Sequence, residues 1–311
     1  MDFLLLILGI AGLLIGTELV IGGALAVARK HHLSEFFVGL IILSIGSDLP
    51  EIAVAVDAGL KTLTGSDASG VVVGSAIGSV VAQIGFVLGT AGLLTHLTLP
   101  KRFIFKHGTV LLGATALLYL TAIDGGITWI EGSMLVIFYI MYVVVLLSRE
   151  RVPPEVEAAV PDETRWPWFQ IIVGLAAVIG CSELTVGSVV RLAYEFGVND
   201  IVISVLIIGL GTSLPELSIS LAAIMKRKVY LSVGNIIGSN IFDTLVPISL
   251  AAMIAPVTVS GSILRFDLPY AFMLTAVVLA LFYRGGGFKR AEAGIVLALY
   301  GGYVVINLLQ L

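Results

Sequence analysis

Two short runs of one pattern each combine a carboxylate with a proline inside a long apolar stretch. Residues 46–51 read Gly-Ser-Asp-Leu-Pro-Glu, and residues 211–216 read Gly-Thr-Ser-Leu-Pro-Glu. An acidic side chain among apolar residues is costly in a membrane, and residues of this kind usually serve a function. Because Glu51 and Glu216 repeat the pattern, we predict a charged site built from two related halves of the chain.

The proline of each run should break the helix that carries it. Pro50 has no N–H and its ring clashes with the preceding turn, so the carbonyl of Gly46 loses its helical partner. Pro215 has the same effect on Gly211. Within a bilayer, such carbonyls are tolerated only where they line a cavity or find another partner. A cation is a natural partner, so we expect two broken helices with oxygen atoms available at each break.

Helical spacing brings further polar side chains toward the breaks. Asp48 lies three residues before Glu51. Hydroxyl groups lie four residues before each glutamate, on Ser47 and Thr212. Two other apolar segments carry polar residues at every fourth position, which places them on one helical face: Ser75, Ser79 and Gln83 in the first, and Asn235, Ser239 and Asp243 in the second.

These side chains offer oxygen as their ligand atom, and the set contains no histidine and no thiol. Hard oxygen ligands suit Ca²⁺ and Na⁺ better than Zn²⁺ or Cu⁺. We therefore predict that the site binds Ca²⁺ and Na⁺, and we expect no prosthetic group. Four glycines beside the polar residues should allow close approach of helices: Gly74, Gly78, Gly234 and Gly238.

The composition is that of a membrane protein. Hydrophobic residues make up 58% of the 311 residues and charged residues 12%, whereas soluble domains carry about 25% charge. A spanning helix needs about 20 mostly apolar residues. We predict an all-α polytopic membrane protein with ten transmembrane helices, at 3–28, 34–60, 68–95, 104–122, 127–148, 167–196, 200–225, 231–256, 266–284 and 290–310.

A single substantial hydrophilic stretch divides the ten predicted helices into five plus five. We expect a first five-helix repeat at 1–148, a hydrophilic linker at 149–166 and a second repeat at 167–311. An odd number of helices per repeat inverts the second repeat in the membrane. Inverted repeats place the transported substrate near the midplane, at the interface of the repeats.

The two halves also align residue by residue. Glu18 and Glu51 match Glu183 and Glu216 at an offset of 165, and residues 73–79 match 233–239 at an offset of 160. The functions of Glu18 and Glu183 stay open between packing or bonding of helices and lining of the ion path.

Basic residues lie mainly on one side of the predicted membrane. Loops after the odd-numbered helices hold fourteen Lys and Arg residues, whereas the other side holds Lys61, Arg191 and Arg265. Cytoplasmic loops carry such an excess. We therefore expect a cell-membrane protein with a cytoplasmic linker and both termini outside, surrounded by lipid, without nucleic acid or a required protein partner. The histidines should anchor helix ends at the interface: His31, His32, His96 and His107.

The second half resembles a known family. Residues 211–216, together with Gly-Asn-Ile-Ile-Gly-Ser-Asn-Ile-Phe-Asp at 234–243, resemble the second α-repeat of the calcium/cation antiporter superfamily, close to its prokaryotic sodium/calcium exchanger branch. The resemblance covers the whole chain in helix count, inverted symmetry and linker position. It implies a ten-helix fold in which helices 2, 3, 7 and 8 form the ion site while helices 1 and 6 slide across this core.

The resemblance also implies roles for single residues. Glu51 and Glu216 would hold Ca²⁺, and further groups would serve the Ca²⁺ and Na⁺ sites: Ser47, Thr212, Ser213, Ser79, Ser239 and Asp243. The first half departs from the family pattern. Asp48 stands where a serine is usual, and Gln83 replaces an asparagine or aspartate. Glutamine at this position is similar to that of proton/calcium exchangers, so the coupling ion stays open between Na⁺, which we favour, and H⁺.

We predict a secondary antiporter and not an enzyme: Ca²⁺ leaves the cytoplasm as Na⁺ enters, by alternating access. The alternative is an H⁺-coupled antiporter of Ca²⁺ or another divalent cation. A passive cation channel is usually an oligomer with a central pore, whereas here one chain holds both halves of a site. An intramembrane hydrolase using Asp48 and Asp243 would need a close carboxylate pair that shares a proton, and no further catalytic signature supports it.

Overall fold

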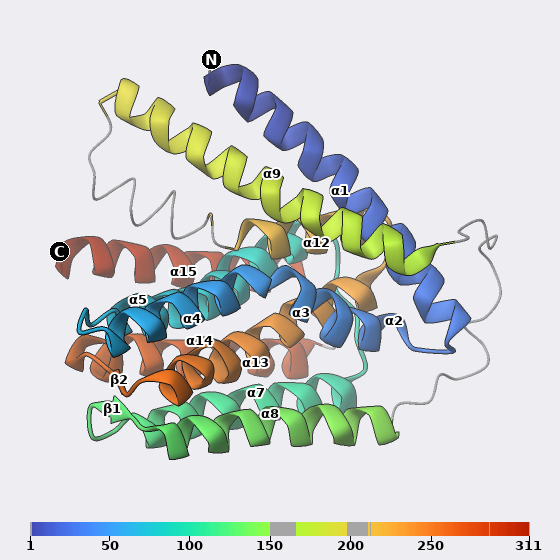
Figure 1. Ribbon diagram of the computed structural model, residues 1–311. Coiled ribbons are helices and arrows are strands. Elements are labelled where there is room, and N and C mark those ends of the chain that lie inside the picture. The colour runs from blue at the N-terminus through green and yellow to red at the C-terminus, as the bar shows by residue number, and fades with distance from the viewer. Residues whose placement is uncertain (1, 150–165, 198–210, 212, 286, 311) are drawn as a thin grey trace. The chain divides into compact units, whose positions relative to one another are not determined.

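The computed structural model consists of helices and two short strands (Figure 1), and it describes residues 2–149, 166–197, 211, 213–285 and 287–310. The elements of the first half are α1 (Asp2–Lys30), α2 (Glu35–Phe37), η1 (Val38–Leu43), α3 (Ser44–Ser47), α4 (Leu49–Leu63), α5 (Ser69–Ala82), η2 (Gln83–Val87), α6 (Leu88–Leu94), α7 (Lys101–Thr121), β1 (Gly126–Ile127) and α8 (Trp129–Arg149). Those of the second half are α9 (Pro167–Glu195), α12 (Leu214–Met225), α13 (Val229–Ile254), β2 (Val257–Thr258), η5 (Ile263–Asp267), α14 (Leu268–Gly285) and α15 (Arg290–Gln310).

The apolar helices confirm the predicted all-α membrane fold. Within the described ranges, eight helices are long and apolar enough to cross a membrane, and Glu35–Ser47 with Leu49–Leu63 can form a ninth, broken span. These nine coincide with nine of the ten predicted spans. The remaining one, 200–225, lies partly outside the described residues, and its described part is the short apolar helix α12. The count of ten therefore stays a prediction.

The chain divides into two compact units, and both contain segments from each half of the sequence. The first unit comprises Met1–Ser47, Ser148–Ile236 and Gly301–Leu311, and the second comprises Asp48–Leu147 and Ile237–Tyr300. The predicted candidate residues are thus distributed over both units.

The first unit is built around the contact of α1 with α9, which lie side by side (Figure 1). The helices run antiparallel, since Gly9 faces Thr185 whereas Gly23 faces Pro167. A Cβ atom added to Gly174 would lie 2.8 Å from the amide nitrogen of Val20, so only glycine allows this approach of the two backbones. Small residues at a helix contact are typical of membrane proteins, where close packing drives association.

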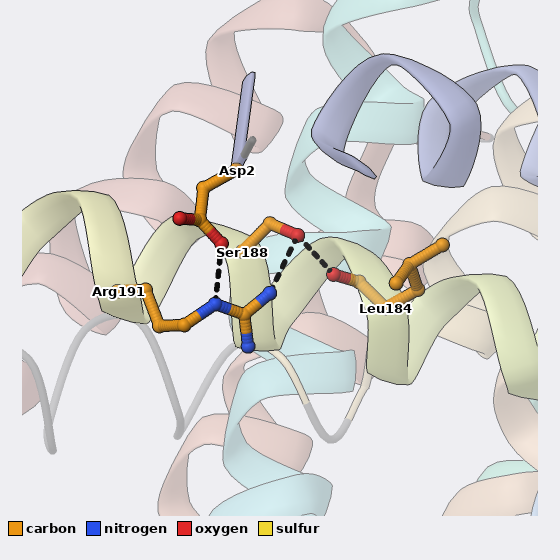
Figure 2. A network of polar contacts seen from close by, with 4 residues as sticks. All are labelled: Asp2, Leu184, Ser188 and Arg191. Atoms are coloured by element: carbon orange, nitrogen blue, oxygen red, sulfur yellow. Dashed lines mark hydrogen bonds and ion pairs between the residues drawn. The ribbon is translucent and has the colours of Figure 1, made fainter. Parts of the chain in front are cut away.

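A polar network joins the beginning of α1 to α9 (Figure 2). The Nε atom of Arg191 donates to Oδ1 of Asp2 at 2.5 Å, and its Nη2 atom donates to Oγ of Ser188 at 3.2 Å. The hydroxyl of Ser188 donates in turn to the carbonyl of Leu184 at 2.7 Å. Because the side chain of Arg191 is half-exposed, solvent screens this ion pair.

Two lysines near the end of α12 pair with acidic residues of the same unit. Lys226 forms an ion pair with Glu18 of α1, and Lys228 donates to Glu35 of α2 at 2.7 Å. The exposed Glu18 therefore bonds a second segment of the unit, one of the functions that the sequence left open. Glu183 is also exposed.

Short backbone pairings in the second unit join loops from the two halves of the sequence. Strand β1 pairs antiparallel with β2, with Gly126 opposite Thr258 and Ile127 opposite Val257. Leu97 and Phe288 exchange two backbone hydrogen bonds of 3.0 and 2.9 Å. Each pairing therefore satisfies backbone groups of one half with groups of the other.

The prediction for His107 is wrong. His107 is fully buried, its Nδ1 atom lies 2.8 Å from the hydroxyl of Tyr142, and its ring meets Phe103 edge-on. The residue lies nearly two turns inside α7, on the side that faces α8, so it packs between helices instead of reaching the interface. His31, His32 and His96 are exposed, as interface residues would be.

The glycine contact of α1 and α9 leads to a stability prediction. Gly174→Val should lower the melting temperature of the purified protein by several degrees, because overpacking of this kind costs about 1–3 kcal/mol. Gly180→Val on the same helix is the matched control, since no described atom lies within 4 Å of a Cβ atom placed there. Thermal unfolding in detergent measures both variants, and equal melting temperatures would contradict the inferred contact.

Candidate functional site

The helix break predicted at Pro50 is present. Helix α3 ends at Ser47, Asp48 has φ −88° and ψ 10°, and α4 begins at Leu49. Proline then lies in the first turn of α4, where its missing N–H costs no helical bond. The hydroxyl of Ser47 donates to the carbonyl of Ser44 at 3.2 Å, so this carbonyl near the end of α3 has a hydrogen-bond donor within the same turn.

The second run has the same local backbone. Ser213 has φ −92° and ψ 10° and precedes α12, with Pro215 in the first turn. Neither Asp48 nor Ser213 uses its side chain to cap the helix that follows. Thr212 and the segment 198–210 lie outside the described residues, so the predicted break of the seventh span stays a prediction.

Both glutamates are buried in the first turn of the helix that follows the proline. Glu51 is 7% exposed in α4, and Glu216 is fully buried in α12. The positive end of the helix dipole favours a carboxylate at this position by about 0.3–1 kcal/mol, and up to ~2 kcal/mol when partly buried. A buried carboxylate costs several kcal/mol more than this, so the dipole offsets only part of the cost.

The other described candidates are also removed from solvent to a large extent. In the first unit, Gly46, Ser47, Ser213 and Asn235 are buried and Gly211 is half-buried. In the second unit, Ser75 is half-buried and the remaining ones are buried: Asp48, Ser79, Gln83, Ser239 and Asp243.

Buried amides and a carboxylate form one network in the second unit. Gln83 donates through Nε2 to Oδ2 of Asp243 at 3.0 Å, and the same nitrogen lies 3.4 Å from the hydroxyl of Ser79. Asn240 donates through Nδ2 to Oε1 of Gln83 at 3.0 Å. The structure therefore brings together three predicted residues of α5, η2 and α13, with Gln83 at their centre.

Asn240 belongs to this network, and the sequence reasoning missed it. The spacing argument followed every fourth position from Asn235, whereas Asn240 lies three residues before Asp243. This spacing also places two side chains on one helical face. Applied here, it would have added Asn240 to the predicted set.

The predicted residue Ser239 is not part of this network. Its hydroxyl is buried and has no hydrogen-bond partner among the described residues.

A small pocket adjoins Glu51 in the second unit. Its lining includes Ala55 of α4, Ser75 of α5 and Pro247 of α13, and it has room for about one water-sized particle. The corresponding positions of the second half, Ser220 and Asn235, lie in the first unit. Ser220 and Asn235 are larger than Ala55 and Ser75, and they contact each other: Asn235 donates through Nδ2 to the hydroxyl of Ser220 at 3.1 Å. Smaller residues at Ala55 and Ser75 thus explain why Glu51 borders a hollow.

The predicted glycine contact is confirmed at Gly234 and stays a prediction at Gly238. A Cβ atom at Gly234 would lie 2.5 Å from the carbonyl oxygen of Phe36, so α13 approaches α2 closely there. No described atom lies within 4 Å of a Cβ atom at Gly74 or Gly78. The equivalents of the Phe36 region in the second half fall within 198–210, outside the described residues, so this part stays a prediction.

The third predicted helix of each half contains an irregular feature at matching positions, but the two features differ. Gln83–Val87 forms a π-helical turn in η2, whereas Pro247, which matches Val87, lies inside α13. Either feature disturbs the regular helical hydrogen bonds, and π-turns are frequent at functional sites. Gln83 is the first residue of the π-helical turn, and Asp243 lies four residues before Pro247.

The chemistry available is that of oxygen ligands. In the described part of the chain, no group of three His, Cys, Asp or Glu side chains could hold a metal ion by itself. A cation there needs hydroxyl, amide or backbone oxygen atoms as well, which the candidate set supplies. Such mixed oxygen ligands are typical of Ca²⁺ coordination.

Similarity to known proteins extends over nearly the whole chain. The CaxA protein of Alkalimonas amylolytica is 31% identical over 311 residues, which cover 96% of this chain and 95% of that protein. The sodium/calcium exchanger MaX1 of Methanosarcina acetivorans is 25% identical over 351 residues, 98% of both chains. A solved structure of the sodium-calcium exchanger NCX_Mj, soaked with 10 mM Na⁺ and 10 mM Sr²⁺, has a TM-score of 0.83 at 27% identity and covers 98% of this chain and 97% of its own.

The family model described as sodium/calcium exchanger protein matches residues 1–148 and 166–309. This match agrees with the membrane fold and with the resemblance of the two Pro-Glu runs. The chain is therefore a membrane protein of the sodium/calcium exchanger family.

Proposed function

We propose that this protein is a secondary antiporter that exports Ca²⁺ in exchange for Na⁺ through alternating access. The observation that carries the proposal is the pair of glutamates, Glu51 and Glu216, each buried in the first turn of a helix behind a proline. Buried carboxylates of this kind need a compensating positive charge. A transported cation provides it, and membership of an exchanger family supports this choice.

The proposed architecture is ten helices in two inverted repeats, with both termini outside. Three observations support it: the nearly identical backbone conformation at Asp48 and Ser213, the pairing of loops from opposite halves, and the excess of basic residues on one side of the predicted membrane. Repeats of this type are known to bind substrate near the midplane and to alternate access by motion of one group of helices against another.

In this proposal Glu51 and Glu216 bind Ca²⁺, and Asp48 adds a third carboxylate. The backbone carbonyls of Gly46 and Gly211 and the side chains of further candidates complete the Ca²⁺ and Na⁺ sites: Ser47, Thr212, Ser213, Ser75, Ser79, Gln83, Asn235, Ser239 and Asp243. Their oxygen atoms and their burial support these roles.

A second candidate function, H⁺-coupled Ca²⁺ antiport, is favoured by the Gln83 network. The amide nitrogen of Gln83 lies against Asp243 and Ser79, two groups that would otherwise offer oxygen atoms to Na⁺. We still favour Na⁺, because the second half keeps four matched oxygen donors: Thr212, Ser213, Ser239 and Asp243.

The first functional prediction concerns the glutamates. Glu51→Gln and Glu216→Gln keep the shape of the side chain and remove its charge, so each should abolish Ca²⁺ transport without loss of folding. Glu195→Gln, at an exposed end of α9, is the control and should transport normally. Counter-transport in vesicles measures all three. Near-normal uptake by either well-folded site variant would refute the proposed site.

The second prediction concerns the coupling ion. An inward Na⁺ gradient at fixed pH should drive Ca²⁺ out of vesicles, and Asp243→Asn should weaken this Na⁺ dependence, since a neutral amide binds Na⁺ less strongly. Asp57→Asn is the control, because Asp57 is exposed and pairs with Lys61.

Two outcomes would contradict the Na⁺-coupled antiporter. Ca²⁺ exchange driven by a pH gradient in the complete absence of Na⁺ would favour the H⁺-coupled alternative. Ca²⁺ flux that needs no opposing ion gradient at all would instead indicate a passive channel.

A further inference from the structure

The Gln83 network contains one side chain, that of Asn240, which the proposed transport site does not include. Asn240 is fully buried in α13, and its Nδ2 atom donates to Oε1 of Gln83 at 3.0 Å. The matching residue of the first half, at an offset of 160, is Val80, which is also buried. Because an apolar side chain fills this position in the first half, packing alone does not require an amide there. The amide of Asn240 therefore needs another explanation.

Gln83 lies between Asn240 and Asp243 in the second unit. These two residues of α13 are three positions apart, so they share one helical face. The Oε1 atom of Gln83 accepts from Asn240, and its Nε2 atom donates to Oδ2 of Asp243 at 3.0 Å. The same nitrogen lies 3.4 Å from the hydroxyl oxygen of Ser79, and all four side chains are buried. The amide thus turns its oxygen to Asn240 and its nitrogen to two residues of the proposed site.

The direction of the Gln83 amide follows from the groups at its two ends. A carboxylate accepts hydrogen bonds and cannot donate them, so Asp243 requires the NH₂ end of the amide. Asn240 presents its own NH₂ group at the opposite end, where it requires the Gln83 oxygen. In the reverse direction, the Gln83 oxygen would face the carboxylate of Asp243, and two buried acceptors in contact are unfavourable. Asn240 and Asp243 therefore select the same direction.

This direction of the amide affects which cations the site can bind. Hard cations are bound through oxygen atoms, and an NH₂ group offers none. A cation that bridged Asp243 and Ser79 would have to lie between their oxygen atoms, and the Nε2 atom of Gln83 lies there instead. Its N–H groups carry partial positive charge, so they bond both oxygens without an ion. Asp243 keeps its negative charge for the remaining cations, because a neutral amide does not neutralise it.

We infer that Asn240 is a positioning residue that holds the NH₂ group of Gln83 toward Asp243 and Ser79, where this group takes the place of one Na⁺ ion. The exchanger then couples one Na⁺ fewer to each Ca²⁺ than it would if Gln83 turned its oxygen to these groups. Gln83 thereby acts in the site as an N–H donor and not as an oxygen ligand. The inference rests on the proposed function, because it takes Asp243 and Ser79 as part of the Na⁺ sites.

Asn240→Asp tests the inference, because it places a second carboxylate beside Gln83. Gln83 then donates to the new carboxylate, while Na⁺ beside Asp243 attracts the amide oxygen. The readout is the Ca²⁺ gradient that just balances an imposed Na⁺ gradient in vesicles whose membrane voltage is held at zero. With a Na⁺ gradient of about tenfold, one additional coupled Na⁺ should raise the balancing Ca²⁺ gradient by about tenfold. A purely structural role of Asn240 would not change this balance.

Further variants separate the direction of the amide from the added charge. In a Gln83→Met background there is no amide to turn, so Asn240→Asp should leave the balancing gradient unchanged. Asn240→Val removes the donor without adding a charge and should act in the same direction as Asn240→Asp, also where the buried aspartate prevents folding. Thr244→Val is the matched control: it removes a buried hydroxyl that donates to the backbone carbonyl of Asn240 at 2.7 Å, and it should keep wild-type coupling.

Several outcomes would overturn the inference. The first is a wild-type balancing gradient in folded Asn240→Val or Asn240→Asp protein. The second is an equal rise of the gradient in the Gln83→Met background, since the added charge alone would then explain it. The third is an equal change in Thr244→Val. A wild-type protein in which a Na⁺ gradient drives no Ca²⁺ movement would instead refute the proposed function, so the two failures are distinguishable.

Discussion

The cost of placing carboxylates in apolar surroundings constrains the whole molecule. Glu216 and Asp48 are fully buried, and Glu51 nearly so, in a chain whose helices are long enough to cross a bilayer. Removal of each charge from water costs several kcal/mol. The helix beginnings at Leu49 and Leu214 offset part of this cost, because the amide dipoles of the first turn point toward the glutamates. The prolines are therefore needed less for bending than for creating a helix terminus inside an apolar segment.

The two halves repeat a backbone plan but differ in side chains. The residues before the Pro-Glu helices share one conformation, whereas one is Asp48 and the other Ser213. Ala55 and Ser75 leave a hollow, whereas Ser220 and Asn235 bond each other. The two halves thus keep the same backbone conformation before the Pro-Glu helix, while the neighbouring side chains differ.

Much of the fold was predictable because its signals are local. Apolar length indicated nine described spans, and the chemistry of proline located the break before Leu49. Contacts between helices were less predictable, because they depend on which faces meet. The burial of His107 against Tyr142 and the place of Asn240 in the Gln83 network follow from such pairings. The oxygen-rich composition of the site could be read from the sequence, whereas the hydrogen bond of Gln83 to Asp243 could not, since 160 positions separate them.

The loop pairings of the second unit bear on whether one half of the sequence could be stable by itself. Strand β1 and Leu97 come from the first half, and their partners, β2 and Phe288, come from the second. A single half would leave these backbone amides and carbonyls without a strand partner. In a single chain the two partners of each pairing are joined covalently, so the pairing does not depend on protein concentration, whereas two separate half-chains would first have to associate.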